Sequence, residues 1–138
     1  MGTEENKALV RRFVEEFWNR GGLAAADELM ASDVTIHAPV DGGLSGLKAF
    51  NAMFRSAFPD WCATAQELVA EGDLVAERWT GRGTHRGELL GIAPTGRPVE
   101  VPGVVFYRIT NGRIAEFRGQ FDRLSLLQQL GVAPAAAV

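Results

Sequence analysis

Residues 68–121 decide the fold, and they read LVAEGDLVAERWTGRGTHRGELLGIAPTGRPVEVPGVVFYRITNGRIAEFRGQF. Glu71-Gly72-Asp73 and Asn111-Gly112 are predicted hairpin turns, because Asn-Gly tolerates the positive φ angles that a tight turn needs. The segments around these turns are strand-like, so we predict four consecutive strands, at residues 61–70, 74–84, 99–110 and 113–121. The Gly- and Pro-rich residues 86–98 form a long loop between the second strand and the third.

The chain before these strands is mostly helical in pattern. Apolar residues recur at spacings of three and four within residues 6–20, which predicts an amphipathic helix. Further helices are expected at residues 23–30 and 47–58, with a short strand at 34–37 between them.

A last helix is predicted at residues 122–130, after the strands. Helices followed by an antiparallel meander indicate an α+β fold, in which a cone-shaped, curved sheet wraps over the N-terminal helices. Three helices cannot fill the concave face of such a sheet, so we expect an apolar pocket at its open end.

Composition excludes several classes of function. The 138 residues suit one domain spanning the chain, and a net charge of −3 with scattered basic residues argues against nucleic-acid binding. Neither a secretory signal nor a membrane-spanning apolar run is visible, so we expect a cytoplasmic protein. The one cysteine, Cys62, is expected to be a buried thiol, and with two histidines the chain lacks a metal-ligand set. We therefore expect no metal and no cofactor.

Four strings of sequence carry a resemblance to a known family. They are FVEEFWNRGGLAAADELMASDVTIHAP (residues 13–39), GLKAFNAMFRSAFPD (46–60), residues 68–117 of the stretch above, and FDRLSLLQQLG (121–131). In this order they resemble the SnoaL-like polyketide cyclase (ester cyclase) branch of the nuclear-transport-factor-2-like superfamily. The resemblance implies a cofactor-independent enzyme that closes a ring in a small hydrophobic ester by an aldol-type reaction.

The resemblance also implies a catalytic acid/base, which falls on Asp122 in the string QFDRL. Strand alternation puts Glu116, Arg118, Gln120 and Asp122 on one face of the last strand, which is either a solvent-exposed face or a polar pocket wall. An aspartate directly before a helix is also a good N-cap. Catalysis and capping both remain open for Asp122.

Three further polar residues are candidates for the reaction itself. Arg78 or Arg118 would hold Asp122 ionised or steady an enolate oxygen, although arginines on a sheet are most often surface residues. His37 ends the first strand, where it would donate a hydrogen bond to a substrate carbonyl or have a structural role.

The remaining candidates concern substrate binding. Asn51 is expected to place an amide in the cavity, and His85 to lie at the pocket mouth. Gln120 would contribute from the polar face of the last strand. The aromatic candidates either line the cavity or belong to the core; they are Trp18, Phe54, Trp79 and Tyr107. The expected ligand is a small hydrophobic molecule.

Two alternatives to the cyclase stay open. Limonene-epoxide hydrolases, which are more distant relatives, pair the last-strand aspartate with an arginine matching Arg78, but Thr80 stands where their second aspartate would be. Ala38 replaces the base of the related ketosteroid isomerases, which argues against that reaction. The other alternative is a non-catalytic ligand-binding domain. A homodimer is expected in either case, because sheets of this superfamily usually pair through their convex faces and Val99–Val105 has apolar residues on both faces.

Overall fold

A computed structural model describes residues 2–38 and 40–132. The helices are α1 (Thr3–Phe13), the π-helix η1 (Val14–Asn19), α2 (Leu23–Leu29), α3 (Gly43–Ala57) and α4 (Arg123–Gln129). The strands are β1 (Met30–Ala38), β2 (Cys62–Glu71), β3 (Leu74–Thr84), β4 (Pro98–Thr110) and β5 (Arg113–Phe121). This order confirms the α+β prediction, with boundaries that differ by a few residues.

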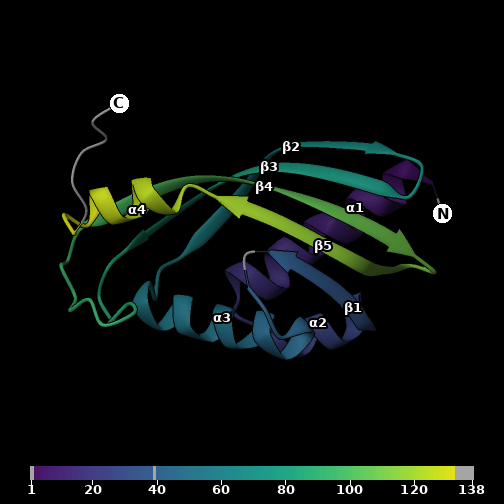
Figure 1. The fold of residues 1–138 in the computed structure, drawn as a ribbon. Helices are drawn as coiled ribbons and strands as arrows, with labels where there is room; N and C mark the ends of the chain where they lie inside the picture. Colours follow the sequence, from purple (N-terminus) through teal and green to yellow (C-terminus); the bar gives the residue numbers. More distant parts are fainter. Residues whose placement is uncertain (1, 39, 133–138) are drawn as a thin grey trace.

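The five strands form one mixed sheet in the order β1-β5-β4-β3-β2. The meander from β2 to β5 is antiparallel, whereas β1 pairs in parallel with β5. Figure 1 shows the curved sheet arching over α1, α2 and α3, with α4 continuing from the end of β5. Asn111 and Gly112 both have positive φ, 51° and 73°, as the predicted hairpin turn requires.

The inner face of the sheet carries the core. Along β4 the residues alternate strictly between buried and exposed, so that Val101, Val105, Tyr107 and Ile109 point toward the helices. The buried residues form two clusters, one under α1, η1 and α2 and the other under α3 and α4. Trp79 packs against both clusters, and the candidate site lies where they meet.

Glycines on the inner face make room for large aromatic rings. A Cβ atom added to Gly103 would lie 2.2 Å from the ring of Trp79, and one added to Gly81 would lie 2.2 Å from the ring of Trp61. Real Cβ atoms do not approach other atoms so closely, so only glycine fits at either position. The two indoles can therefore lie flat against the strands.

Two expectations were wrong at the level of local structure. Cys62 is exposed rather than buried, because the alternation of β2 turns Ala63 inward and Cys62 outward. The third helix begins at Gly43 rather than Leu47, after Gly42 in a left-handed conformation with φ of 91°. Within the described residues, no helix has the length and apolar character needed to cross a membrane.

The contact between Gly103 and Trp79 leads to a stability prediction. Gly103→Ala should lower the free energy of unfolding by about 1–3 kcal/mol, because the new methyl group overpacks the site against the indole. Urea denaturation measures the effect.

A double variant identifies the cause of that loss. The double variant Gly103→Ala/Trp79→Leu should lose less free energy of unfolding than the sum of the losses in the two single variants, because the smaller leucine side chain at position 79 relieves the clash. Strict additivity, or an unchanged stability of Gly103→Ala, would contradict the steric explanation.

Candidate active site

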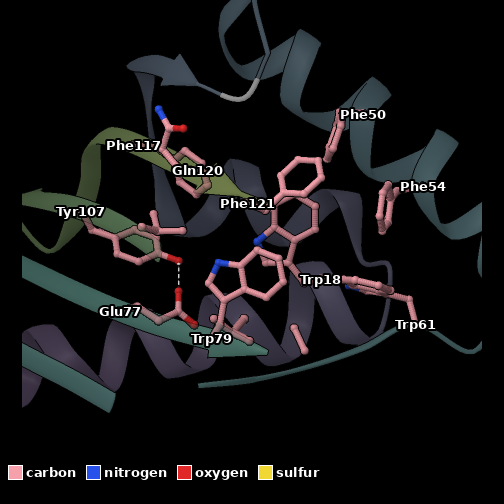
Figure 2. Close-up of a pocket in the computed structure, with 14 residues that line it drawn as sticks. Trp18, Phe50, Phe54, Trp61, Glu77, Trp79, Tyr107, Phe117, Gln120 and Phe121 are labelled. Carbon is pink, nitrogen blue, oxygen red and sulfur yellow. Dashed lines mark hydrogen bonds between the residues drawn. The ribbon is translucent and has the colours of Figure 1, made fainter. Parts of the chain in front are cut away.

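An apolar pocket lies between the concave face of the sheet and the helices η1 and α3 (Figure 2). Its free volume is about 60 Å³, and nearly all of its wall is carbon. Most of the lining side chains are aromatic; they are Trp18, Phe50, Phe54, Trp61, Trp79, Tyr107, Phe117 and Phe121. The other lining residues are Val14, Ala63, Glu77, Val105, Gly119 and Gln120.

Glu77 is the single carboxyl group among the described residues that line this pocket. It lies on the inner face of β3, between the inward-facing Val75 and Trp79, and only 3% of its surface is exposed. The phenol of Tyr107, on the neighbouring strand β4, donates a hydrogen bond of 2.6 Å to Oε1 of Glu77. In Figure 2 this pair lies at one end of the ring cluster, with Phe54 and Trp61 toward the other.

The buried position changes the acidity of both groups. Burial raises the pKa of Glu77 from 4.5 to about 7, and the hydrogen bond from Tyr107 opposes this shift only partly. Burial, together with the neighbouring carboxylate, raises the pKa of Tyr107 well above its ordinary value of 10. At neutral pH, Glu77 therefore populates both its charged and its neutral form, which suits a group that takes and returns protons.

Trp18 is held in the pocket wall by contacts at the end of η1. The amide nitrogen of Asn51 donates to the carbonyl of Phe17 at 2.9 Å, and Arg55 Nη1 donates to the carbonyl of Trp18 at 2.8 Å. Both donors lie on α3, one turn apart. Carbonyls at a helix end have no partner within the helix, so these bonds satisfy them and fix the last turn of η1 against α3.

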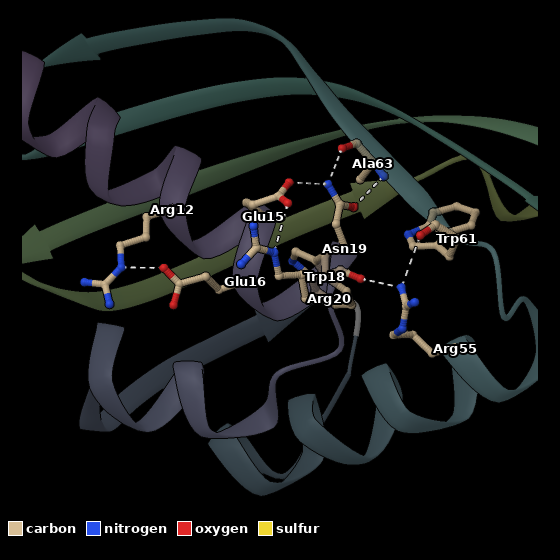
Figure 3. A network of polar contacts seen from close by, with 9 residues as sticks. All are labelled: Arg12, Glu15, Glu16, Trp18, Asn19, Arg20, Arg55, Trp61 and Ala63. Atoms are coloured by element: carbon tan, nitrogen blue, oxygen red, sulfur yellow. Dashed lines mark hydrogen bonds and ion pairs between the residues drawn. The ribbon is translucent and has the colours of Figure 1, made fainter.

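Asn19 ties the same helix end to the sheet, as Figure 3 shows. Its side-chain amide donates to the Ala63 carbonyl at 2.9 Å, and its side-chain oxygen accepts from the Ala63 amide at 2.7 Å. The side chain thus takes the place of a neighbouring strand on the edge strand β2. The contact therefore fixes two lining residues of the pocket relative to each other, Trp18 on η1 and Ala63 on β2.

Asp122 lies outside the pocket. Its carboxylate accepts a hydrogen bond of 2.9 Å from the amide of Ser125, and the residue is exposed at the start of α4. Of the two roles left open for Asp122, this contact is the N-cap. The catalytic role has no support from the geometry, because Asp122 does not line the pocket.

Both arginine candidates lie on the outer face of the sheet. Arg78 is exposed and its Nε lies 2.6 Å from Glu67 Oε1, while Arg118 is exposed and its Nη2 lies 3.7 Å from Glu116 Oε1. The cause is strand alternation, which turns Glu77 inward and its neighbour Arg78 outward. Of the four residues predicted on the polar face of the last strand, Glu116, Arg118 and Asp122 lie outside the pocket lining, and Gln120 contributes to it.

The histidine candidates also lie away from the pocket lining. His37 Nε2 is 3.5 Å from Glu116 Oε1, beside the outer-face charges. His85 is fully buried in the loop after β3, its ring 5.5 Å from Phe58, and its Nδ1 accepts a hydrogen bond of 3.1 Å from the amide of Thr95. In the part of the chain that is described, no three His, Cys, Asp or Glu side chains cluster to hold a metal ion.

The remaining substrate-binding candidates divide into two groups. Trp18, Phe54, Trp79 and Tyr107 lie in the pocket wall. Gln120 contributes to the lining, but the residue is exposed and its amide points away from the rings in Figure 2. Asn51 is fully buried and anchors η1 instead of lining the pocket.

Sequence reasoning missed Glu77, although a signal for it was present. In the segment Val75-Ala76-Glu77-Arg78-Trp79, the two apolar residues with strong preferences for the core are Val75 and Trp79. A period of two then puts Glu77 on the same inward face. A carboxyl group at such a position is either neutralised, paired or functional.

The raised pKa of Glu77 leads to a prediction for stability against pH. Because the folded-state pKa of about 7 exceeds the unfolded value of 4.5, the contribution of Glu77 is fully present below pH 4.5 and is lost as the pH rises through 7. From pH 4.5 to 8, wild type should lose up to about 3 kcal/mol relative to Glu77→Gln, which keeps an acceptor for Tyr107 but no charge.

Urea denaturation of wild type and Glu77→Gln across this pH range measures the difference. Every other titrating group contributes equally to both proteins, so only Glu77 remains in the comparison. Parallel curves for the two proteins would show that Glu77 is not perturbed in the folded state.

Comparison with known proteins agrees with the fold. The family model described as SnoaL-like polyketide cyclase matches residues 8–130. No curated protein matches the sequence.

Several solved structures are similar over nearly the whole chain. IdmH from Streptomyces antibioticus, assigned provisionally as a polyketide cyclase, is 36% identical, with 92% of this chain and 99% of that one covered and a TM-score of 0.82. A provisional polyketide cyclase from Acidithiobacillus ferrooxidans is 30% identical (97% and 100% covered, TM-score 0.83). AclR from Streptomyces galilaeus, provisionally a hydroxylase, is 29% identical (98% and 90% covered, TM-score 0.88). The chain belongs to the SnoaL-like polyketide cyclase family.

Proposed function

We propose that this protein closes a ring in a small hydrophobic substrate with several carbonyl groups, and that Glu77 is the acid/base of the reaction. One observation carries the proposal: among its described lining residues, the largely apolar and aromatic pocket holds a single carboxyl group, with a pKa of about 7. Family membership supports cyclisation as the type of reaction.

The reaction needs one proton acceptor that later returns the proton. Ionised Glu77 takes a proton from a carbon between two carbonyls, and the electron pair of that C–H bond moves onto a carbonyl oxygen as an enolate. The enolate carbon then attacks a second carbonyl of the same molecule, which forms the new C–C bond and leaves an alkoxide. Neutral Glu77 returns its proton to the alkoxide, so the reaction is a net isomerisation without a co-reactant.

Tyr107 prepares Glu77 for this sequence. Its hydroxyl occupies Oε1, which leaves Oε2 to accept the substrate proton. Once Glu77 is neutral, it is a weaker acceptor, and the Tyr107 hydroxyl is free to donate to the enolate or alkoxide oxygen. The raised pKa of Tyr107 keeps that hydroxyl protonated throughout.

The aromatic wall supports the same chemistry. Rings from η1, α3 and the sheet enclose the carboxyl group and exclude water, which strengthens every charge interaction inside. Flat walls also hold a folded chain so that its two reacting carbons lie together. The epoxide hydrolase alternative loses its main support, because Arg78 points away from the pocket and pairs with Glu67 on the outer face.

Hydrogen–deuterium exchange tests the proposed proton transfer. Ethyl 2-methyl-3-oxobutanoate has one exchangeable hydrogen between two carbonyls, and its loss in D₂O can be followed by NMR. Wild type should accelerate exchange, more so as the pH rises through 7, and Glu77→Gln should reduce the acceleration about 100-fold or more, as expected for a general base.

Asp122→Asn is the matched control, since it also neutralises one carboxylate but at the cap of α4. It should keep the acceleration and lower the free energy of unfolding by no more than about 1 kcal/mol. Loss of exchange in Asp122→Asn but not in Glu77→Gln would instead identify Asp122 as the base. An absence of exchange in wild type would favour a non-catalytic binding domain.

We also propose that the protein forms a homodimer through the outer face of the sheet. Val104 and Phe106 are 43% and 45% exposed on β4, the central strand of the sheet, so this face carries adjoining apolar side chains at its middle. Across the ladder they are paired with Arg78 and Arg118. An apolar centre flanked by charges suits a two-fold contact of this face with itself.

Sedimentation analysis tests the dimer. Wild type should sediment as a dimer and Phe106→Glu as a monomer, because a charge would be buried in the apolar centre. Thr110→Glu, on the same face of β4 but at the end of the strand, should remain dimeric. A monomeric wild type would rule the dimer out.

A further inference from the structure

A second, larger cavity adjoins the active-site pocket, and we call it the outer groove. It is bounded by α3, α4, the loop between β1 and α3, and the loop between β3 and β4. Its free volume is about 630 Å³, against about 60 Å³ for the pocket. Its wall is largely apolar, and of its described lining residues only Asp41 and Arg123 are charged.

Three aromatic rings separate the two cavities. Phe50, Phe54 and Phe121 line both of them. Their ring centroids lie 5.5 Å apart for Phe50 and Phe54, and 6.3 Å for each of these with Phe121. These three side chains form the wall that the two cavities share, and Phe50 and Phe121 are only partly buried in it.

The active-site pocket alone is too small for a whole substrate. Sites for small organic molecules usually measure about 300–1,000 Å³, so the pocket holds a reacting group but not a whole polycarbonyl compound. The outer groove falls within that range. We propose that the outer groove binds the apolar tail of an elongated carbonyl compound whose reacting end passes the three rings to Glu77. The second half of this statement rests on the proposed function.

The loop that borders the groove carries an independent sign of a ligand. Leu90 has φ of 48°, a left-handed conformation that suits asparagine or glycine, and its side chain is 76% exposed at the groove. Leu89 and Ile92 exchange backbone hydrogen bonds of 3.0 and 2.8 Å around it, which closes a two-residue turn. Turns of this kind favour Asn-Gly, so a strained and exposed leucine indicates a contact that the folded chain alone does not supply.

Arg123 contributes to the partition from the same side. Its guanidinium carbon lies 5.4 Å from the centroid of the Phe121 ring, so the cation holds that ring at the boundary of the two cavities. In the proposed complex the ligand therefore passes beside Phe50, which Arg123 does not hold, and its tail packs on Leu126 and Leu127, which line the groove from α4.

Binding of a homologous series of straight-chain 2-alkanones tests the groove. Dissociation constants from NMR titration should fall about three- to fourfold for each added methylene once the chain enters the groove, as expected for burial of one CH₂. Ala49→Trp, which fills the groove from the exposed side of α3, should flatten this dependence on chain length. Ala52→Trp places the same residue on the same helix outside both cavities and should leave the dependence as in wild type.

Leu90→Asn is a second test, because it removes the apolar side chain while giving the turn a residue that it prefers. The variant should melt at the same or a higher temperature than wild type and yet lose part of the chain-length dependence. Reduced stability together with an unchanged dependence would show that Leu90 serves the fold and not a ligand.

The outcomes separate this proposal from the proposed function. The groove proposal would be overturned if the dissociation constants did not change with chain length in wild type, or changed equally in Ala49→Trp and Ala52→Trp. This holds even if Glu77 catalyses proton exchange. A steep dependence that Ala49→Trp abolishes would support the groove even if no exchange is found, in which case only the chemistry at Glu77 fails.

Discussion

The hydrogen bond between Tyr107 and Glu77 is the interaction on which the account of this protein depends. A carboxyl group that is 97% removed from solvent would be costly if it had no partner, and Tyr107 supplies one at 2.6 Å. The bond spans two adjacent strands, so the ladder between β3 and β4 fixes its geometry. The hydrogen bond offsets only part of the cost of burying the carboxylate, and the rest raises the pKa of Glu77 to about 7. A group that transfers protons at neutral pH needs such a pKa.

The rest of the fold maintains an apolar space in front of this pair. Glycines at positions 81 and 103 let two indoles lie against the sheet, and the ties from Asn51, Arg55 and Asn19 hold the end of η1 over it. The end of the π-helix η1 is fixed in place because its last carbonyls accept hydrogen bonds from side chains of α3 instead of from water. The strands, the helices and the two glycines therefore build one wall of aromatic rings, in which Glu77 is the carboxyl group among the described lining residues.

Much of the fold could be predicted from the sequence, and the reason is periodicity. The helices and the four meander strands follow from spacings of three to four and of two, and Asn111-Gly112 fixed a turn that the structure confirms. The N-cap role of Asp122 was visible in the same local way. Such features depend on neighbours in the chain, which the sequence displays directly.

The site was harder to predict from the sequence, because it depends on contacts between segments that are far apart in the chain. The pairing of Glu77 with Tyr107 joins residues 30 positions apart, and Asn51 reaches Phe17 across 34. The resemblance directed attention to Asp122 and Arg78, whereas the alternation of β3 turns Arg78 outward and Glu77 inward. The π-helix and the ring partition between the two cavities depend on side-chain packing, for which no local pattern exists.

Direct titration of the Glu77 carboxyl group tests the central claim most closely. The side-chain ¹³C chemical shift of Glu77, assigned by comparison with Glu77→Gln, reports its protonation without relying on stability or on any substrate. The account predicts a midpoint of about 7, and a higher midpoint in Tyr107→Phe, because the bond that favours the ionised form is lost. A midpoint near the ordinary value of 4.5 would contradict the account, since Glu77 would then be fully ionised at neutral pH and too weak a base for the proposed reaction.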